Sequence, residues 1–328
     1  MTDSLPAHDD VVAAAQRLKG FVRRTPVLRH DAIDAMAGAR IFVKAECLQE
    51  TGSFKIRGAT NRLRQIPDAQ RAAGVVAFSS GNHAQGVARA ARLLNMPALI
   101  VMPSDAPQVK VDGVRADGGE VLLYDRNTEN REEIAGRITA ERGAVLVPSY
   151  DDPYIIAGQG TAGLEFADQM AEQDTALDHL ICGAGGGGLI SGTALAFERK
   201  SPSTRIWTAE PEGHDDWARS LASGQIERNA PGTHSFCDAI LTPAPGNLTF
   251  AIGKRLLSGG FTVSDDEVAA AMRAAFRYLK IVTEPGGTVA LATVLSRLPE
   301  NMKGKSVGVF ITGGNVEAAF YAGILQGE

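Results

Sequence analysis

The segment Ser53-Phe54-Lys55-Ile56-Arg57-Gly58-Ala59 places one lysine between an aromatic residue and the Gly/Ala-rich start of a predicted helix. It closely follows a strand-like apolar run, Ile41 to Ala45. A lysine held in such a place can lose its proton through desolvation and become a nucleophilic amine. The alternative is a lysine that opens a surface helix, and the heptapeptide taken alone favours that alternative.

Three further segments rich in glycine or small polar residues follow Lys55 along the chain. They are Ser79-Ser80-Gly81-Asn82-His83, Gly183-Ala184-Gly185-Gly186-Gly187-Gly188 and Thr312-Gly313-Gly314-Asn315. A nucleophilic amine can form a Schiff base with an aldehyde, and pyridoxal phosphate (PLP) is the commonest biological aldehyde handled in this way. The ordered set of segments raises this interpretation above the surface-helix alternative.

Short apolar runs alternate with Ala-rich amphipathic stretches along most of the chain. The runs are 75–78, 98–102, 121–124, 144–147, 179–182 and 307–311, and the expected helices after them are 82–95, from Pro107 onward, 128–142, 155–171, 189–199 and a final helix. This alternation predicts an α/β fold with parallel sheets flanked by helices. Ligands of such sheets bind at the carboxyl ends of strands. All four segments occupy that position, so we expect them to form one site.

Length and composition bound the organisation of the chain. With 328 residues and 44% hydrophobic residues it can bury a large core, and we expect two domains. The predicted division is a small domain, residues 74–150, inserted into a larger domain made of residues 1–73 and 151–328. A site between two domains also suggests closure on the substrate.

Charge and cysteine content restrict the classes of partner. A net charge of −5 offers no attraction to nucleic acid or to an anionic membrane. No apolar run reaches the length of a membrane span, and the polar N-terminus has no targeting segment. Cys47, Cys182 and Cys237 are far apart and form no CxxC pair. Buried free thiols in a reducing compartment are therefore expected, and we predict a cytoplasmic protein.

The glycine run between residues 183 and 188 follows an apolar strand and leads into an apolar helix. Such a loop lets backbone amides approach a phosphate, and the helix N-terminus favours negative charge. No Lys-Ser/Thr pair follows it, so a nucleotide P-loop is disfavoured. The spacing also fits a dinucleotide fingerprint formally, and a tight turn without a ligand is the remaining alternative. The strand before the run and the helix after it favour phosphate binding.

Taken together, these segments resemble fold-type II PLP enzymes, which share the tryptophan synthase β-like fold, and specifically the serine/threonine dehydratase and serine racemase family. The resemblance extends from Thr25 to Asn315. It rests on Thr25-Pro26-Val27-Leu28, Lys44-Ala45-Glu46-Cys47-Leu48-Gln49, residues 53–59, Ser79 to Gln85, Ala157-Gly158-Gln159-Gly160-Thr161, Gly185 to Gly188, and Thr312 to Asn315.

The resemblance implies which residues hold the cofactor. Lys55 resembles the lysine that carries PLP, and its freed amine would take the α-proton of the substrate. Phe54 would pack beside PLP, and Asn82 would bind its ring hydroxyl. Thr312 would face the pyridine nitrogen, where a hydroxyl cannot supply the ion pair of an aspartate. The phosphate would lie against Gly185, Gly186, Gly187 and Gly188.

The resemblance also implies substrate contacts. The loop Ser79 to His83, which includes Asn82, would bind the α-carboxylate through backbone amides at a helix start. Ser80 matches the serine that faces Lys55 as a second acid/base in the racemase; an N-cap of the helix is its alternative role. Arg131 aligns with an arginine that meets the distal carboxylate of dicarboxylate ligands. A solvated helix arginine is the alternative there.

The resemblance further implies a divalent-cation site formed by Glu210, the carbonyl of His214, and Asp216. Two carboxylates, a carbonyl and waters form a hard oxygen set that suits Mg²⁺ or Ca²⁺. An acidic helix start, where Asp and Glu are expected anyway, is the alternative.

The expected activity is PLP-dependent β-elimination of a small β-hydroxy-α-amino acid. Because of Arg131 we favour 3-hydroxyaspartate over serine or threonine as the substrate. Its elimination would give iminosuccinate, and then oxaloacetate and ammonia. Such an enzyme is a lyase of the dehydratase (ammonia-lyase) class, and the family makes a homodimer the expected assembly. An amino-acid racemase on the same scaffold is the alternative. The role of Glu284 stays open.

Overall fold

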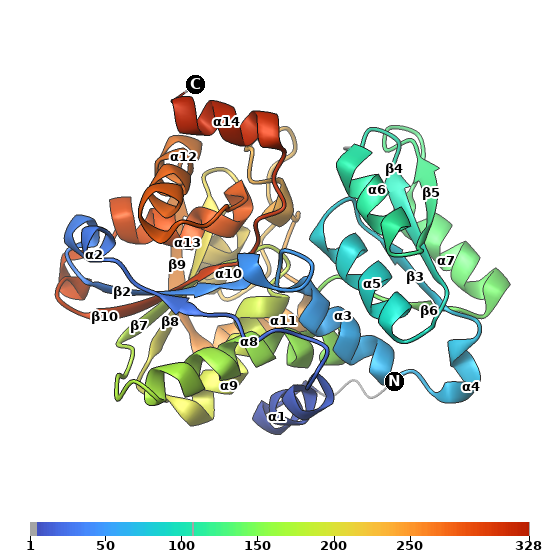
Figure 1. Cartoon of the computed structure of the whole chain (residues 1–328), viewed down its shortest axis with the longest axis horizontal. Coiled ribbons are helices and arrows are strands. Elements are labelled where there is room, and N and C mark those ends of the chain that lie inside the picture. The colour runs from blue at the N-terminus through green and yellow to red at the C-terminus, as the bar shows by residue number, and fades with distance from the viewer. Residues whose placement is uncertain (1–4, 107, 328) are drawn as a thin grey trace.

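The computed structural model describes residues 5–106 and 108–327 of the chain. It contains two separate sheets, each flanked by helices, on opposite sides of Figure 1. The six-stranded sheet has the order β1-β2-β10-β7-β8-β9 and the four-stranded sheet the order β5-β4-β3-β6. Only the β1–β2 pair is antiparallel among the described strands. The predicted α/β class with parallel sheets is therefore confirmed.

The strands are short and mostly buried. They are β1 (Val27–Leu28), β2 (Arg40–Ala45), β3 (Val75–Phe78), β4 (Ala98–Pro103), β5 (Glu120–Tyr124), β6 (Val145–Leu146), β7 (His179–Gly183), β8 (Arg205–Pro211), β9 (Leu257–Val263) and β10 (Ser306–Ile311). The described helices are α1 (His8–Arg17), α2 (Asp31–Ala37), α3 (Lys55–Arg64), α4 (Asp68–Arg71), α5 (Asn82–Leu93), α6 (Gln108–Ala116), α7 (Arg131–Arg142), α8 (Pro153–Ala171), α9 (Gly188–Lys200), α10 (Asp216–Ser223), α11 (Asn247–Leu256), α12 (Asp265–Ala274), α13 (Pro285–Ser296) and α14 (Ala318–Gln326).

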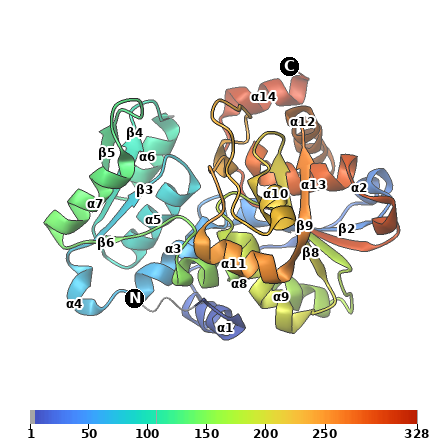
Figure 2. The same cartoon turned by 180° about the vertical axis from the view of Figure 1, so that it is seen from behind.

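Both faces of the large sheet are covered by helices. Successive strand residues point to opposite faces. Ile41 and Val43 of β2 accordingly join the core cluster that includes residues of α12 and α13, whereas Phe42 joins the cluster of α8 and α9. Figure 2 shows α8, α9 and α11 on one side of this sheet. Burial on both faces explains why the strands were recognisable as continuous apolar runs.

Local capping residues set where several helices begin. Asp152 accepts hydrogen bonds from two backbone amides of α8, and Pro153 occupies the first helical turn. Asn130 caps α7 in the same way, so this helix begins at Arg131 rather than at the predicted residue 128. The sequence predicted a helix from Pro107 onward. In the structure this helix is α6, which begins at Gln108, and Pro107 itself lies outside the described residues.

Helix α3, which begins with Lys55, packs on α8 with almost no side chain between the two backbones. A Cβ atom added to Gly158 would lie 2.7 Å from the Cα of Gly58. Gly58 and Gly158 thus allow a backbone-to-backbone contact one turn after Lys55. The position of Lys55 is therefore determined by main-chain packing.

A buried ionic cluster lies beside this contact. Arg57 donates to both carboxylate oxygens of Glu46, at 2.8 Å each, and also to Glu165. Lys44 donates to Glu165 and to the carbonyl of Thr25. Burial lowers the pKa of Lys44. Burial also acts to lower the pKa of Arg57, but the carboxylates of Glu46 and Glu165 together outweigh it and raise that pKa. This cluster joins β2, α3 and α8 behind the loop that precedes Lys55.

None of the described helices combines the length and hydropathy needed to cross a bilayer.

Candidate active site

Lys55 opens α3, in the region between the two sheets. Its Nζ donates a hydrogen bond to the carbonyl oxygen of Ser149 at 3.0 Å and lies 5.2 Å from the centre of the Phe54 ring. Burial lowers the pKa of Lys55 to about 8, and the carboxyl group of Glu284 partly opposes this shift. A substantial fraction of the amine is therefore neutral near physiological pH, which is the form that attacks a carbonyl carbon.

The Ser79–His83 loop follows β3 and turns directly into α5. Gly81 is the N-cap residue of α5, and no side chain caps this helix, so Ser80 does not take the capping role. Ser80 is partly exposed, whereas Asn82 and His83 are buried. Nε2 of His83 lies 2.9 Å from the carbonyl oxygen of Val147, and burial lowers the pKa of His83 to about 3. The imidazole is therefore neutral and structural, and the loop can offer its backbone amides at a helix start.

Helices α3 and α5 bring this loop next to Lys55. A Cβ added to Gly86 of α5 would lie 3.1 Å from the backbone carbon of Lys55. This close approach places the start of the small-sheet helix against the start of the lysine helix. The two segments are thus brought together, as their shared position at strand ends predicted.

The glycine loop connects β7 to α9. Gly187 has a φ of +94°, a conformation that other residues rarely adopt. The carbonyl of Gly185 accepts from Nε1 of Trp217 at 2.6 Å, and the carbonyl of Gly186 accepts from the Thr249 hydroxyl at 2.7 Å. A Cβ on Gly186 would overlap the ring of Tyr150. These contacts hold the loop in place through its carbonyls. The amides at the start of α9 lie at a helix N-terminus, which favours an anion, so the loop fits a phosphate group.

Thr312 follows β10 and is buried. Its carbonyl accepts from the amide of Phe54 at 3.2 Å, and the neighbouring residues Ser53 and Gly313 form a β-bridge. Phe54 is partly buried. These contacts place the Thr312 segment beside the Lys55 segment, although 257 residues separate the two in the chain.

Two polar side chains without an assigned role, Glu284 and Asn315, complete the site by contacting Asn82. Asn82 donates from Nδ2 to the Glu284 carboxyl group at 2.6 Å, and its Oδ1 accepts from Nδ2 of Asn315 at 2.7 Å. Burial raises the pKa of Glu284 to about 8. Both Glu284 and Asn315 belong to motifs of the sequence, and no function was predicted for either. The available signals were a carboxylate before a helix-opening proline and an asparagine after a glycine pair.

Arg131 lies exposed at the first turn of α7, with its guanidinium 5.4 Å from the centre of the Phe78 ring. Phe78 ends β3 directly before Ser79, so Arg131 lies beside the loop expected to bind the substrate. The exposed ion pairs on the same helix involve Arg137 and Arg142. Arg131 is thus exposed, as in the solvated-arginine alternative, and it also stacks on Phe78, so both interpretations stay open.

Glu210 and Asp216 lie close together near the glycine loop, whose Gly185 carbonyl accepts from the Trp217 that follows Asp216. Glu210 accepts hydrogen bonds from the amides of Trp217 and Ala218, so it supports the first turn of α10. Burial and the nearby Asp216 raise the pKa of Glu210 well above its ordinary value, and burial raises that of Asp216 to about 6. One carboxylate oxygen of Asp216 is buried without a hydrogen-bond partner. Two buried carboxylates with an unsatisfied oxygen fit a hard cation.

Across the described part of the chain, no three His, Cys, Asp or Glu side chains cluster as metal ligands. His214 is buried beside this pair, and its amide donates to the Pro211 carbonyl. A cation here would thus depend on Glu210, Asp216 and a backbone carbonyl.

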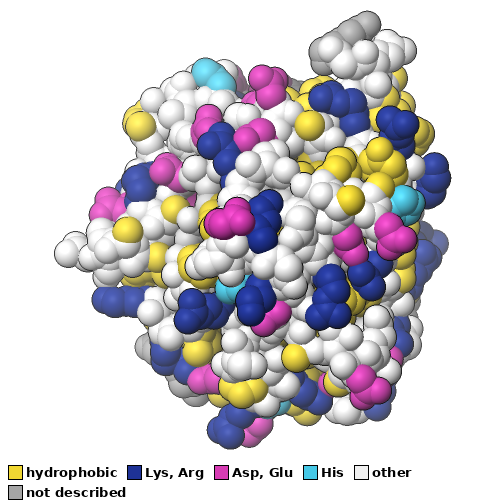
Figure 3. Space-filling view, turned by 90° about the vertical axis from the view of Figure 1, so that its left-hand side faces the viewer, with side chains coloured by type: hydrophobic (Ala, Val, Ile, Leu, Met, Phe, Trp, Pro, Cys, Tyr) yellow, Lys and Arg dark blue, Asp and Glu magenta, His cyan; other side chains and the backbone are white. Residues whose placement is uncertain are grey.

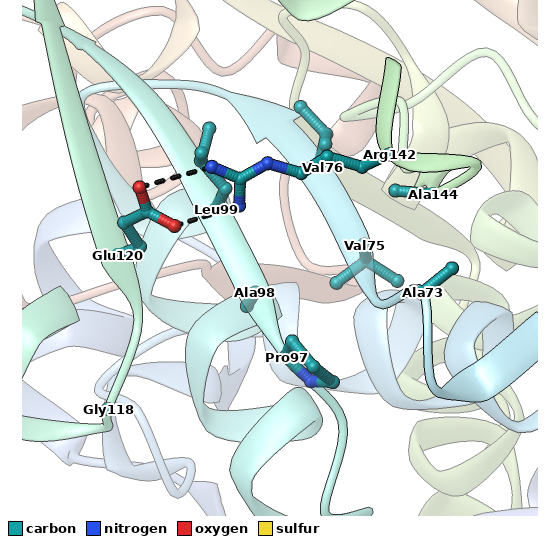
Figure 4. Close-up of a pocket in the computed structure, with 10 residues that line it drawn as sticks. All are labelled: Ala73, Val75, Val76, Pro97, Ala98, Leu99, Gly118, Glu120, Arg142 and Ala144. Atoms are coloured by element: carbon teal, nitrogen blue, oxygen red, sulfur yellow. Dashed lines mark hydrogen bonds and ion pairs between the residues drawn. The ribbon is translucent and has the colours of Figure 1, made fainter. Parts of the chain in front are cut away.

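A cavity of 230 Å³ lies at the opposite end of the small sheet (Figure 4). It is lined by the first residues of three strands, Val75, Ala98 and Glu120, and the Glu120–Arg142 ion pair lies across it. Because ligands of parallel sheets bind at the carboxyl ends of the strands, this cavity is not part of the candidate site.

Fold and site geometry define an enzyme that uses PLP, and comparison with known proteins agrees. A model of the family described as "Pyridoxal-phosphate dependent enzyme" matches residues 18–313, and the chain belongs to this family. An L-threo-3-hydroxyaspartate ammonia-lyase from Pseudomonas sp is 48% identical over 98% of this chain and 99% of its own length. A serine racemase from Schizosaccharomyces pombe is 41% identical over 99% of this chain and 100% of its own. A solved maize serine racemase is 38% identical with a TM-score of 0.92, covering 99% of this chain and 98% of that one. The predicted resemblance to fold-type II PLP enzymes is thus confirmed.

Proposed function

We propose that this protein is a PLP-dependent ammonia-lyase that acts on 3-hydroxyaspartate. The observation that carries the proposal is the amine of Lys55, which has a lowered pKa and donates to the carbonyl of Ser149, directly before the Tyr150 that packs against Gly186 of the glycine loop. Identity of 48% to a protein named for this activity supports the same substrate.

The residues of the site would divide the work of binding PLP. Lys55 would bind its aldehyde carbon, residues 185–188 its phosphate, and Asn82 its ring oxygen, with Thr312 at the ring nitrogen and Phe54 beside the ring. When bound, PLP withdraws electrons from the α-carbon of an amino acid and so makes the α-proton acidic.

Lys55 would move the protons of the reaction. Its amine would take the α-proton of the substrate, and the resulting ammonium would stay next to the reacting atoms. That ammonium would pass its proton to the departing β-hydroxyl, which would leave as water. The enamine product would become an imine, and water would hydrolyse this imine to a keto acid and ammonia. Lys55 is partly buried, and its surroundings would limit the access of water to this transfer.

Substrate selection would rest on one loop, Ser79–His83, and on Arg131 in the first turn of α7. The α-carboxylate would be bound by backbone amides at the start of α5. These amides belong to the Ser79–His83 loop, and the residues expected to contribute are Ser79, Ser80, Asn82 and His83. Arg131, stacked on Phe78 beside that loop, would bind the distal carboxylate of 3-hydroxyaspartate with two parallel hydrogen bonds.

Racemisation is the second candidate activity, and one observation favours it. Ser80 is partly exposed and is not consumed by helix capping, since Gly81 is the N-cap residue. Its hydroxyl would then be free to protonate the α-carbon on the face opposite Lys55. The 41% identity to a protein named serine racemase supports this candidate.

A divalent cation, Mg²⁺ or Ca²⁺, would bind between Glu210 and Asp216 with the His214 carbonyl. The unpartnered oxygen of Asp216 supports this proposal. The cation would hold α10, whose Trp217 donates to the glycine loop, so it would stabilise the phosphate site indirectly.

Assembly and location complete the proposal. Phe276, Val282 and Phe320 are exposed apolar residues of the half with the large sheet, and apolar patches on one face of the molecule are visible in Figure 3. Such exposure supports a homodimer.

The free, buried thiols of Cys47, Cys182 and Cys237 support a reducing, cytoplasmic location. Residues 74–150, which contain the small sheet, would form the domain that closes over the substrate.

The first test is ammonia release from serine, threonine and the four stereoisomers of 3-hydroxyaspartate, with Lys55→Ala as the control. Strong release from one 3-hydroxyaspartate isomer, absent in the control, supports the proposal. Release mainly from serine or threonine refutes the dicarboxylate assignment. Absence of release together with inversion of serine or aspartate, measured by chiral chromatography, replaces the lyase with the racemase.

A further inference from the structure

Asn82 reaches the cofactor site from α5 with an amide group whose two ends differ chemically. Its oxygen accepts hydrogen bonds and its nitrogen donates them. Which end faces the ligand therefore decides whether the ring oxygen of PLP is bound as an acceptor or as a donor. The structure fixes this orientation through a chain of contacts that begins outside the site.

The chain of contacts starts at a backbone carbonyl. Nδ2 of Asn315 donates to the carbonyl oxygen of Thr51 at 2.8 Å. A carbonyl oxygen only accepts, so the nitrogen end of Asn315 must face Thr51. The same nitrogen donates its second hydrogen to Oδ1 of Asn82 at 2.7 Å. Asn315 therefore places the oxygen end of Asn82 on its own side.

The other end of Asn82 faces Glu284. Nδ2 of Asn82 donates to the Glu284 carboxyl group at 2.6 Å. A carboxyl oxygen accepts this bond in either protonation state, so the contact holds on both sides of the pKa of Glu284. The contacts of the described residues engage one of the two N–H groups of Asn82, and the second remains for a ligand.

The backbone around these side chains is shaped to admit them. Gly52 has a φ of +70°, and a Cβ there would overlap the side chain of Asn315. A Cβ on Gly313 would overlap the carboxyl group of Glu284. Two glycines in adjacent loops thus leave room for the two residues that hold Asn82.

We propose that Asn315 is a positioning residue that fixes Asn82 as a hydrogen-bond donor toward the ring oxygen of PLP, so that this oxygen is bound in its deprotonated form. The proposal rests on the role of Asn82 given under the proposed function. Asn315 itself acts through Asn82 and need not touch PLP.

Asn315→Asp tests the proposal because it keeps the shape and removes the donor. An ionised aspartate can only accept. Asn82 would then turn its nitrogen toward residue 315 and its oxygen toward the ligand and Glu284, whose carboxyl group would have to be protonated to donate to that oxygen. We expect the dissociation constant of PLP for the apoprotein to rise at least about tenfold. The share of bound PLP that absorbs at long wavelength, the band of the deprotonated ring oxygen, should also fall.

Two further variants separate orientation from charge and folding. Asn315→Ala frees Asn82 to sample both orientations, so its loss of PLP affinity should lie between those of wild type and Asn315→Asp. Asn301→Asp makes the same chemical change at an exposed position of the short helix Glu300–Met302 and should leave both readouts unchanged. Should Asn315→Asp fail to fold by circular dichroism of the apoprotein, Asn315→Ala carries the test.

Wild-type affinity and absorbance in both Asn315 variants would overturn the inference. These readouts need no turnover. Wild-type protein that binds PLP but releases no ammonia would refute the lyase and leave the positioning role of Asn315 in place.

Discussion

The carboxylate of Glu46 accepts two hydrogen bonds from the guanidinium of Arg57, at 2.8 Å each, and both side chains are buried. Arg57 lies two residues after Lys55, so this ion pair secures the helix that presents the reactive amine. Removing one partner of a buried pair leaves the other charge uncompensated.

Glu46→Gln should therefore lower the free energy of unfolding by about 3 to 5 kcal/mol. Urea denaturation of the apoprotein measures the change. The matched control is Arg24→Ala, which removes an ion pair with Glu172 in which both side chains are exposed, and should cost no more than about 1 kcal/mol. Equal losses of unfolding free energy in the two variants would show that the buried ion pair stabilises the protein no more than the exposed one.

The pKa of Lys55, lowered to about 8, predicts how PLP capture depends on pH. Only the neutral amine attacks, so the rate at which apoprotein takes up PLP should rise about tenfold per pH unit below 8 and level off above it. An ordinary lysine would continue to gain up to its usual pKa of 10.5. Stopped-flow absorbance measures the rate.

Glu284→Gln checks whether the Glu284 carboxyl group raises or lowers the pKa of Lys55. The carboxyl group of Glu284 raises the pKa of Lys55 against the larger effect of burial. Removing the charge should move the midpoint of the rate profile to lower pH. A shift to higher pH would contradict the described electrostatics.

Gly186→Ala should weaken PLP binding, since the new methyl group overlaps the ring of Tyr150 and the loop must move. We expect at least about a tenfold rise in the dissociation constant of PLP. Gly136→Ala is the matched control, because Gly136 lies within α7 with no atom near the added methyl. That change should leave PLP affinity intact and add about 0.5 to 1 kcal/mol of stability.

Arg131→Ala should reduce kcat/KM for 3-hydroxyaspartate by about 10- to 100-fold, the size of a charge-assisted contact, while sparing serine. Arg137→Ala, on the same helix but paired with Glu141, should change neither substrate. Equal loss on both substrates would mean that Arg131 supports the loop structure and does not bind the distal carboxylate.

Addition of Mg²⁺ or Ca²⁺ to EDTA-treated protein should raise its melting temperature, because the cation would neutralise two buried carboxylates. Asp216→Asn should abolish the rise, whereas Asp168→Asn, at an exposed surface ion pair with Lys200, should keep it. Identical melting in EDTA and in either cation would exclude the proposed site.

The sequence predicted those features that depend on local pattern. Strand runs alternate with amphipathic helices, and the loops at their carboxyl ends supply Lys55, Asn82 and the glycine loop. Contacts between distant side chains leave no such pattern. Asn82 is 202 residues from Glu284 and 233 from Asn315, so their hydrogen bonds could not be anticipated. The Ser149 carbonyl that accepts from Lys55 is a backbone atom, which any residue type supplies equally.

The contact between Gly58 and Gly158 has a consequence for how this enzyme tolerates change. The two helices meet chiefly through their main chains, with the side chains of Gln159 and Asn61 beside the two glycines, so few side chains set the distance between the helices. Substitutions in the surrounding apolar core can accumulate and repack without displacing the reactive amine. A single added methyl at either glycine, by contrast, acts as a spacer that tilts the whole lysine-bearing helix, so a change chemically remote from the cofactor would be felt directly at its aldehyde carbon.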